Sequence, residues 1–273
     1  MSLIAKMMPS VFAKGGRMPD LEKLAAIVDE AAVNAKAIPQ FTNTMPEMTI
    51  EDGYDIQTRS LARRYQRGER RIGIKLGLTS RAKMLQVGVD EVCWGRLTDA
   101  MLLDDGGYLS MAKYIHPRIE PEIAFLIKTR LVGKVTEQDA FDAVEAIAPA
   151  MEIIDSRFDN FKFAVQDVIA DNASSSGLVI GPWQSTKIDI SNLEMVMTAD
   201  DQIKQSGSSA AILGHPIRSL IKGAEMVARV GEALNPGDIV MAGGATAAHA
   251  MTRGETIRLN IQKLGSVSIS AEG

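Results

Sequence analysis

From residue 72 onward, the sequence consists largely of short apolar runs that glycines and other turn residues interrupt. Runs of this length and composition are typical of β-strands, and their number predicts a β-rich core. The expected strands are residues 72–78, 123–127, 149–154, 178–180, 194–198, 239–242, 257–261 and 267–269. Because so many short strands have to pair with one another, this pattern constrains the fold more than any other feature of the chain.

Helical patterns precede and interrupt these runs. Apolar residues at helical spacing predict one helix near residues 21–32 and a second at 49–67. Thr49 and Asp52 resemble the capping box that often begins a helix, which supports the second of these. Further helices are expected at residues 137–147, 161–170 and 217–230.

The two patterns together predict a mixed α/β protein in two parts. Residues 1–70 form an N-terminal helical segment, and residues 71–273 form the β-rich domain. Helices and strands do not alternate regularly, and the chain has no Gly-x-Gly-x-x-Gly or Gly-Lys-Ser/Thr loop. A dinucleotide-binding or nucleotide-binding fold is therefore not indicated.

Composition excludes several classes of protein. The 273 residues are 46% hydrophobic, which allows a sizeable core, and the net charge of -4 without a basic stripe gives no footprint for nucleic acid. No apolar run approaches the roughly 20 residues of a membrane-spanning helix. Cys93 is the only cysteine and so forms no internal disulfide, and no signal segment opens the chain. A cytoplasmic protein without membrane or nucleic-acid partners is expected.

A basic cluster lies at the end of the second expected helix. Positive charge is favourable at a helix C-terminus, and a solvated helix face explains the cluster without any binding role. The cluster comprises Arg63, Arg64, Arg67, Arg70 and Arg71.

Glu120, Glu122 and Glu152 lie among apolar residues, where a solvent-exposed charge is not expected. If the strand at 123–127 begins near Arg118, the spacing of two places Glu120 and Glu122 on one face, although an ordinary half-exposed strand has the same alternation. Glu152 favours a metal site, because burying an unpaired carboxylate is costly unless a cation compensates it. Oxygen ligands suit Mg²⁺ or Mn²⁺, whereas the histidines and the cysteine lack the spacing of a zinc site.

Lys75 is the second candidate for chemistry. It lies in residues 73–79, a glycine-flanked strand whose other central members are apolar. A lysine in such a place either pairs with a carboxylate or takes part in the reaction. A surface lysine with a buried stem explains the spacing equally well.

Two further segments have the composition of ligand-binding loops. The first comprises Ser174, Ser175 and Ser176. Their hydroxyls and backbone amides could hold a carboxylate, although a helix-ending turn has the same pattern. In the second, residues 242–246, Gly244 and Thr246 either lie close to a ligand or mark a plain exit from a strand. The three histidines lie apart, without a nucleophile motif, and are expected to be structural; they are His116, His215 and His249.

Five motifs combine these candidates in one chain. They are Gly73-Ile-Lys75-Leu-Gly-Leu-Thr-Ser-Arg81, His116-Pro-Arg-Ile-Glu120-Pro-Glu122-Ile-Ala-Phe125, Ala150-Met-Glu152-Ile-Ile-Asp155-Ser-Arg157, Asp171-Asn172-Ala-Ser-Ser-Ser176 and Ile212-Leu-Gly-His-Pro216. As a set, they resemble the hydratase and decarboxylase branch of the fumarylacetoacetate hydrolase superfamily. The resemblance runs from about Thr49 to the C-terminus, and the set is much more specific than any one of its members.

Other segments resemble the decarboxylases of this branch more than its hydratases. They are Trp94-Gly-Arg-Leu-Thr-Asp-Ala100, Phe161-Lys-Phe163, Gly181-Pro-Trp183 and Met241-Ala-Gly-Gly-Ala-Thr-Ala-Ala248. Hydratases of the branch also tend to carry an acidic residue two positions before the glycine that is Gly95 here, where this chain has Cys93. The loss of that acid puts activation of water in doubt and favours decarboxylation.

The resemblance implies a fumarylacetoacetate hydrolase-like β-rich catalytic domain after the helical segment. It implies that Glu120, Glu122 and Glu152 bind Mg²⁺, with Mn²⁺ as the other candidate, and that Lys75 lines the active site. The implied reaction is metal-dependent decarboxylation of a 2-oxo dicarboxylate, 2-oxo-3-hexenedioate, to 2-hydroxypenta-2,4-dienoate and CO₂. This reaction belongs to the meta-cleavage pathway of aromatic hydrocarbon catabolism.

Roles for the remaining candidates follow from this reaction. Lys75 is expected to stabilise negative charge or to assist proton transfer, and the serine run, Gly244 and Thr246 to bind substrate. Trp94 and Cys93 are expected to keep water from the departing carboxylate. The alternatives are a hydratase acting on 2-hydroxypenta-2,4-dienoate and a catalytically idle subunit that holds a partner enzyme. The resemblance also implies a homo-oligomer and a complex with the downstream hydratase.

Overall fold

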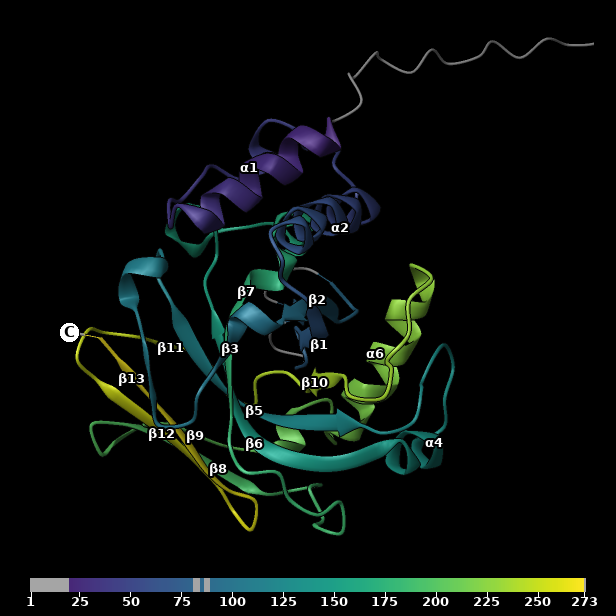
Figure 1. Ribbon diagram of the computed structural model, residues 1–273, viewed down its shortest axis with the longest axis vertical. Coiled ribbons are helices and arrows are strands. Elements are labelled where there is room, and N and C mark those ends of the chain that lie inside the picture. Colours follow the sequence, from purple (N-terminus) through teal and green to yellow (C-terminus); the bar gives the residue numbers. More distant parts are fainter. Residues whose placement is uncertain (1–19, 81–83, 86–88, 273) are drawn as a thin grey trace, which may run out of the picture.

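The computed structural model describes residues 20–80, 84–85 and 89–272. Two β-sheets form the body of the molecule, and the helices of the N-terminal segment cover one side of it (Figure 1). The mixed α/β class with N-terminal helices is therefore confirmed. Arg81, the last residue of the lysine-containing motif, lies outside the described residues.

The larger sheet has eight strands and contains all the segments that carry the predicted chemistry. The strand order is β2-β1-β10-β5-β6-β7-β3, and β11 pairs with β5 beside this path. Strand β1 is parallel to β10 and antiparallel to β2, and β5 is antiparallel to β6 along nearly its whole length. The strands are β1 (Arg71–Gly77), β2 (Cys93–Thr98), β3 (Leu102–Leu103), β5 (Arg118–Ile127), β6 (Val144–Ile154), β7 (Ser175–Ile180), β10 (Ile239–Met241) and β11 (His249–Ala250).

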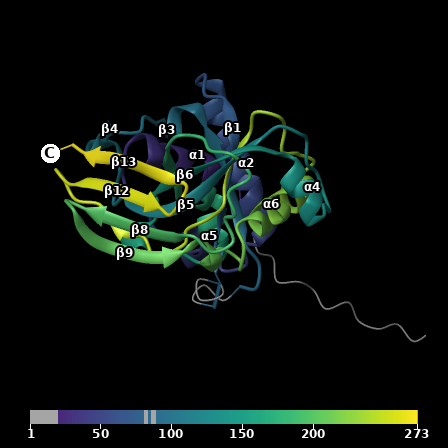
Figure 2. The same ribbon diagram turned by 90° about the horizontal axis from the view of Figure 1, so that it is seen from below.

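The smaller sheet has five strands in the order β4-β13-β12-β8-β9 and forms an outer layer, in which β13, β12, β8 and β9 lie side by side in Figure 2. Every second residue of β12 is buried, as expected for a sheet with one face in the core. Ile257, Leu259 and Ile261 on that face belong to the same apolar cluster as Phe125 and Ile153 of the larger sheet. The strands are β4 (Gly107–Leu109), β8 (Glu194–Ala199), β9 (Gln202–Ser208), β12 (Thr256–Ile261) and β13 (Gly265–Ala271).

The other face of the larger sheet encloses a second buried cluster of smaller side chains. It contains Leu97, Met101, Ala124, Ala148, Ala150, Leu178 and Met241. The alanines leave room on this face, and the sheet curls around it (Figure 1). The curl brings β2 close to the start of β7: Asn172 Nδ2 donates to the Arg96 carbonyl at 2.9 Å, and Arg96 N donates to Asn172 Oδ1 at 2.8 Å.

Glycine at position 95 allows this closure. A Cβ atom there would overlap the carbonyl oxygen of Asn172, so the segment before β7 approaches β2 more closely than another residue would permit. As a result, both faces of the larger sheet are covered, and side chains on its inner face are removed from water.

The helices lie on the outside of the two sheets. Helix α2 begins with the predicted capping box: Asp52 N donates to Thr49 Oγ1 at 3.1 Å, and Thr49 N donates to Asp52 Oδ2 at 2.9 Å. None of the helices in the described part of the chain has the length and apolar character that crossing a membrane requires. The α-helices are α1 (Leu21–Val33), α2 (Ile50–Gln66), α4 (Glu137–Asp142), α5 (Val165–Ala170) and α6 (Ile217–Arg229). Short 3-10 turns are η1 (Phe41–Asn43), η2 (Asp99–Met101), η3 (Met111–Lys113), η4 (Asp159–Phe161), η5 (Asn172–Ser174) and η6 (Ser209–Ala211).

Gln57 of α2 fixes the helical segment to the larger sheet. Its fully buried amide Nε2 donates to the Trp94 carbonyl at 3.1 Å and to the Ile169 carbonyl at 3.0 Å. Its Oε1 accepts a hydrogen bond of 2.7 Å from Arg96 Nη1. One side chain thus satisfies polar groups of α2, β2 and α5 at once. The division of the chain after residue 70 stays a prediction.

The predicted helix at 137–147 was too long. Helix α4 ends at Asp142, and β6 begins at Val144. A helix through 144–147 would leave the end of β5 unpaired, because Ile127, Leu126 and Phe125 bond to this stretch. Pairing with a neighbouring strand therefore outweighed the local helical pattern.

The predicted helix at 161–170 was also too long. Only Val165–Ala170 is helical, because Asn160 and Phe161 adopt positive φ angles of 59° and 58° that interrupt a helix. Several strands were missed entirely, and they are short, polar or glycine-containing: β2, β3, β4, β9 and β11.

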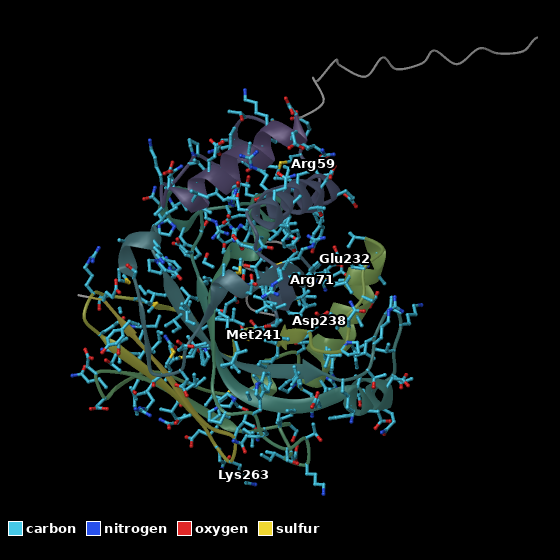
Figure 3. All side chains as sticks on the ribbon, viewed as in Figure 1. Arg59, Arg71, Glu232, Asp238, Met241 and Lys263 are labelled. Carbon is cyan, nitrogen blue, oxygen red and sulfur yellow. The ribbon has the colours of Figure 1, made fainter. Side chains whose placement is uncertain are left out.

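The basic cluster is not simply a solvated helix face. Arg63 Nε and Arg67 Nη2 lie 2.9 and 2.7 Å from the carboxylate of Asp29, whose side chain is 1% exposed. Arg71 Nη1 lies 2.8 Å from Glu232 Oε2 and its Nη2 lies 3.7 Å from Asp238 Oδ2; all three residues are labelled in Figure 3. The earlier interpretation is incomplete for these three arginines: their side chains remain partly or largely solvated, but they also pair with carboxylates far away in the sequence.

Candidate functional site

Glu120, Glu122 and Glu152 converge on the inner face of the larger sheet. Glu120 is directly opposite Glu152 in the β5–β6 register, and Glu122 follows Glu120 on the same face of β5. One carboxylate oxygen from each residue lies within 4.8 Å of the other two. Their relative exposures are 8%, 0% and 0%, so the half-exposed strand considered above does not occur.

The surroundings of these carboxylates favour a bound cation. Burial, and then repulsion from Glu152, raises the pKa of Glu122 well above its ordinary value, against the attraction of Lys75 and a hydrogen bond from Gly243. Burial likewise raises the pKa of Glu152, although Lys75 opposes it. Glu122 Oε1 and Glu152 Oε1 are buried and have no hydrogen-bond partner in the described part of the chain.

A divalent cation fits this donor set. Three carboxylates without histidine or cysteine make a hard, oxygen-only site, which suits Mg²⁺ or Mn²⁺ better than zinc. A cation would also neutralise the repulsion between the glutamates and would satisfy oxygens that otherwise lack partners.

Lys75 belongs to the same group of side chains. Its Nζ lies 2.9 Å from Glu152 Oε2, and the lysine side chain is 4% exposed. Burial alone would lower the pKa of Lys75, but attraction to Glu152, with a smaller contribution from Glu122, keeps that pKa above its ordinary value. The surface lysine considered above is excluded, and the buried ammonium group is charged.

Cys93 lies beside this ammonium group. A Cβ atom at Gly77 would be 2.8 Å from Cys93 Sγ and 3.8 Å from Lys75 Nζ, so both groups border the same small space. Burial raises the pKa of Cys93 to about 11, although Lys75 lowers it. At neutral pH, the thiol is therefore protonated and contributes no charge next to Lys75.

The serine run divides into three different environments. Ser174 Oγ is buried and has no hydrogen-bond partner among the described residues. Ser175 Oγ lies 3.9 Å from the sulfur of Met101, on the inner face of the sheet. Ser176 Oγ accepts a hydrogen bond from the guanidinium group of Arg157. Of the three hydroxyls, that of Ser174 is the one without a partner.

The glycine-rich loop after β10 runs beside the glutamates. Gly243 N donates to Glu122 Oε2 at 2.7 Å, which places the loop against the carboxylate. Gly244 follows it and is also buried. Thr246 is half-buried, and its Oγ1 donates to the Ala247 carbonyl at 3.0 Å.

The side chain of Trp94 does not lie on the face of the sheet that carries the glutamates. It is opposite Leu76 in the β1–β2 register, whereas Lys75 is opposite Gly95, so the Trp94 side chain lies on the other face of the sheet. There, its ring stacks on Tyr54 at a centroid distance of 5.7 Å, and the Arg96 guanidinium lies 4.6 Å from the ring. Contact between Trp94 and a substrate stays a prediction.

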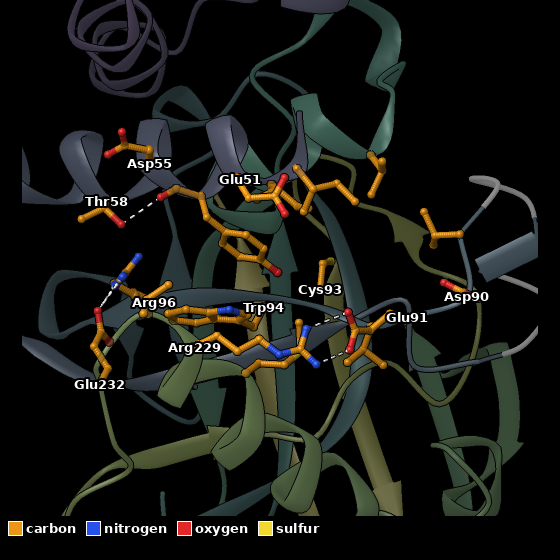
Figure 4. Close-up of a pocket in the computed structure, with 18 residues that line it drawn as sticks. Glu51, Asp55, Thr58, Asp90, Glu91, Cys93, Trp94, Arg96, Arg229 and Glu232 are labelled. Atoms are coloured by element: carbon orange, nitrogen blue, oxygen red, sulfur yellow. Dashed lines mark hydrogen bonds and ion pairs between the residues drawn. The ribbon is translucent and has the colours of Figure 1, made fainter. Parts of the chain in front are cut away.

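A pocket of about 890 Å³ lies on this other side (Figure 4). Its walls include Tyr54, Trp94 and the ion pair in which Arg229 Nη2 lies 2.7 Å from Glu91 Oε1. None of the three glutamates lines this pocket, but Cys93 does. Cys93 thus lies between the large pocket and the space next to Lys75.

Each of the three histidines has a hydrogen-bond partner within the protein, and their structural role stays a prediction. His116 Nε2 is 2.7 Å from the Ser156 carbonyl, His215 Nδ1 accepts from Ile217 N, and His249 Nε2 is 3.3 Å from Glu255.

Two features of the site were not predicted from the sequence. Arg157 and Asp171 form a buried ion pair beside the serine run, and Arg157 also donates to the Asp171 carbonyl at 2.6 Å. Thr79, two residues after β1, is 1% exposed and has a hydroxyl without a partner in the described part of the chain. A hydroxyl residue two positions after the end of a strand that carries a buried lysine was the available signal for Thr79.

Comparisons with known proteins agree with this geometry. The family model described as fumarylacetoacetate (FAA) hydrolase C-terminal matches residues 88–270. A 4-oxalocrotonate decarboxylase of a Pseudomonas species is 51% identical over 253 residues, which are 93% of this chain and 98% of that protein. A 2-hydroxyhexa-2,4-dienoate hydratase of Comamonas testosteroni is 35% identical over 88% of this chain and 93% of that protein.

A solved structure supports the same assignment of the fold. The 4-oxalocrotonate decarboxylase from Pseudomonas putida G7, complexed with magnesium and adipate, has a TM-score of 0.90 with this structure at 39% sequence identity. The match covers 92% of this chain and 97% of that one. The architecture described above is therefore that of a known group of metal-binding enzymes.

Proposed function

Because the chain belongs to the fumarylacetoacetate hydrolase family, we propose that it is a divalent-metal-dependent decarboxylase, a carboxy-lyase that acts on 2-oxo-3-hexenedioate (4-oxalocrotonate). The products are 2-hydroxypenta-2,4-dienoate and CO₂. Two observations from the comparisons support this choice: the decarboxylases resemble the chain along almost its whole length, and the hydratases among its relatives are less similar.

One structural observation carries the proposal. Three buried glutamates, of which Glu122 and Glu152 have oxygens without a hydrogen-bond partner among the described residues, lie next to a buried, charged lysine on one face of a curled sheet. A protein that only holds a partner enzyme has no use for such an arrangement, because each buried carboxylate is costly. The arrangement therefore favours catalysis over an idle subunit.

The reaction requires an electron acceptor within the substrate. When the bond between C5 and the C6 carboxylate breaks, CO₂ leaves, and the electron pair moves through the conjugated double bond to the 2-oxo oxygen. Protonation of the resulting dienolate on that oxygen gives 2-hydroxypenta-2,4-dienoate. Mg²⁺ or Mn²⁺, held by Glu120, Glu122 and Glu152, would supply the Lewis acid that makes the 2-oxo group a better acceptor.

Lys75 contributes a fixed positive charge inside the site. Its ion pair with Glu152 fixes Nζ in position, and the raised pKa of Lys75 keeps the amine protonated at neutral pH. Negative charge that develops on the substrate is stabilised by this ammonium group, which is also able to donate a proton from Nζ. Its effect is large because the surroundings are buried and contain little water.

The remaining residues bind and orient the substrate. Ser174 is the member of the serine run whose hydroxyl is available to a substrate carboxylate, since Arg157 occupies Ser176. The loop that contains Gly244 and Thr246 borders Glu122 through its neighbour Gly243 and forms another wall. The uncharged thiol of Cys93 leaves Lys75 without a competing acid at this position.

The rival reaction is hydration of 2-hydroxypenta-2,4-dienoate, which uses the same kind of site. The two are separated by incubating the protein with each substrate, with and without Mg²⁺. Metal-dependent release of CO₂ from 2-oxo-3-hexenedioate supports the proposal. Formation of 4-hydroxy-2-oxopentanoate from the dienoate, without release of CO₂ from the dicarboxylate, would show that the protein is a hydratase.

Association with other subunits is part of the proposal. Tyr108 on β4 and Ile203 on β9 are 72% and 68% exposed at the two edges of the five-stranded sheet, where apolar side chains favour contact with another chain. We expect a homo-oligomer by light scattering. We also expect co-elution with the downstream hydratase, which would consume the unstable dienol. A cytoplasmic location agrees with the buried, unpaired Cys93.

A further inference from the structure

Thr79 has a buried hydroxyl group that no residue in the described part of the chain satisfies. The residue is 1% exposed, and its Oγ1 forms no hydrogen bond with any of the residues that the structure describes. Most buried hydroxyls in folded proteins are paired, because an unmade hydrogen bond is costly. An unpaired hydroxyl therefore suggests a partner that the chain itself does not provide.

The backbone holds this hydroxyl in a defined place. Leu78, immediately before Thr79, has a φ angle of 58°, in the left-handed region that bulky residues rarely adopt. The Thr79 carbonyl accepts a hydrogen bond of 3.0 Å from Leu213 N, which fixes the residue after this turn. The position of the threonine side chain is thus maintained at the expense of an unfavourable backbone conformation.

Gly243 connects Thr79 to the glutamates. Its φ angle is 101°, and a Cβ atom there would overlap the Thr79 side chain, including Oγ1. The same residue donates its N–H to Glu122 Oε2 at 2.7 Å. Thr79 and Glu122 therefore contact the same glycine, one at its α-carbon and the other at its nitrogen.

Other unpaired atoms border the same site. Buried side-chain oxygens without partners occur in five described residues, and all but Tyr65 lie on segments around the glutamates; they are Tyr65, Thr79, Glu122, Glu152 and Ser174. Carboxylates only accept hydrogen bonds when ionised, so a substrate carboxylate that enters beside them needs donors from other residues. A threonine hydroxyl meets that need.

We propose that Thr79 is a substrate-binding residue whose Oγ1–H donates a hydrogen bond to the 1-carboxylate of the substrate, next to the glutamates. This inference rests on the proposed function and extends it. It names a contact that would recognise the end of the substrate that carries adjacent carboxylate and oxo groups. It also explains why Gly243 and the turn at Leu78 are needed, since both place this hydroxyl.

The test compares Thr79→Val, which keeps the shape and removes the hydroxyl, with Thr79→Ser, which keeps the hydroxyl. Adipate, a saturated six-carbon dicarboxylate, serves as the probe, and its binding is measured by calorimetry in saturating Mg²⁺. We expect adipate to bind Thr79→Val about 10- to 100-fold more weakly than wild type and Thr79→Ser within about threefold of it, because one hydrogen bond to a charged acceptor is lost only in the valine variant. Mg²⁺ binding without adipate is expected to be unchanged in both.

Kinetics give an independent readout. Since the proposed contact binds the part of the substrate that does not react, Thr79→Val is expected to raise KM for 2-oxo-3-hexenedioate more than it lowers kcat. Thr98→Val is the matched control, because it removes a buried hydroxyl that already donates to Glu69 Oε2 at 2.6 Å. It should change stability without changing adipate affinity. Thr79→Ala, which adds no bulk beside Gly243, repeats the test if valine disturbs the packing.

The possible results distinguish failure of the Thr79 proposal from failure of the proposed function. Wild-type adipate affinity and an unchanged KM in folded Thr79→Val or Thr79→Ala would overturn the role of Thr79 and leave the proposed function intact. Absence of Mg²⁺-dependent adipate binding in the wild type, together with absence of CO₂ release, would overturn both.

Discussion

Lys75 Nζ lies 2.9 Å from Glu152 Oε2, and both side chains are almost completely enclosed by the protein. In the order of the larger sheet, two strands, β10 and β5, lie between β1, which carries Lys75, and β6, which carries Glu152. The ion pair forms because the inner face of the sheet curls, so that side chains from β1 and β6 meet. It couples the residue proposed to act on the substrate to a residue proposed to hold the metal.

Replacement of Lys75 by methionine tests this coupling. Lys75→Met keeps most of the apolar stem and removes the charge, which leaves Glu152 unpaired. We expect the metal-free protein to lose about 3–5 kcal/mol of unfolding free energy and turnover to fall by about 10²- to 10⁴-fold. Urea unfolding with and without Mg²⁺ provides the check, since a bound cation should restore part of the lost stability. Wild-type turnover in this variant would remove Lys75 from the mechanism.

Glu122→Gln has opposite effects on stability and metal binding. The glutamine still accepts the hydrogen bond from Gly243 N but removes one of the buried negative charges. We expect the metal-free variant to be more stable than the wild type by roughly 1–3 kcal/mol and to lose the stabilisation that Mg²⁺ provides. Thermal unfolding at several Mg²⁺ concentrations measures both. An equal Mg²⁺-dependent rise in Tm in variant and wild type would show that Glu122 is not a ligand.

Cys93→Asp tests the importance of an uncharged group beside Lys75. The new carboxylate would compete with Glu152 for the ammonium group, so decarboxylation should fall by at least about tenfold. Cys93→Ser, which adds no charge, is the control and should retain most of the activity. CO₂ release is measured for all three proteins, and hydration of 2-hydroxypenta-2,4-dienoate is measured in parallel. Unchanged decarboxylation in Cys93→Asp would argue against any role for charge at this position.

Gln57→Leu tests how strongly the N-terminal helices are joined to the sheet. The change leaves the Trp94 and Ile169 carbonyls and an Arg96 N–H without their partner, all of them buried. We expect a loss of about 2–5 kcal/mol in unfolding free energy. Gln66→Leu, at the exposed end of the same helix, should change it by less than about 0.5 kcal/mol. Equal effects of the two changes in urea unfolding would contradict the anchoring role of Gln57.

His215 predicts a pH dependence of stability. Its pKa is lowered, first by burial and also by Arg218, against the attraction of Asp189 and Glu137. Its Nδ1 accepts a hydrogen bond of 3.1 Å from Ile217 N at the start of α6, which an imidazolium could not do. As the pH falls, His215 is therefore protonated at a higher pH in the unfolded chain than in the folded protein. The contribution of neutral His215 to the unfolding free energy is fully present above the unfolded pKa of 6.5. It is lost as the pH falls from 6.5 through the lower pKa of the folded protein.

The matched variant for this effect is His215→Asn, which keeps an acceptor oxygen and does not titrate. When the pH is lowered from 7.5 to 5.5, the unfolding free energy should decrease more in the wild type than in the variant. The same decrease in both proteins would assign the acid sensitivity to other groups.

The sequence by itself determined the candidates for chemistry. Alternation along a strand put Glu120 and Glu122 on one face, because side chains on a strand alternate between its two faces. The costly burial of Glu152 pointed to a cation, and the motifs around Lys75 and the glutamates pointed to the family. Each of these inferences depends on residues close together in the chain, for which local geometry is sufficient.

Only the tertiary structure decided which of these residues meet. The β5–β6 register places Glu152 opposite Glu120, and the curl of the sheet brings Lys75 to Glu152. The same strand pairing turned residues 144–147 from a predicted helix into part of β6, and the register of β2 put Trp94 on the face away from Lys75. Pairing and closure of strands are long-range interactions, and local patterns do not encode them.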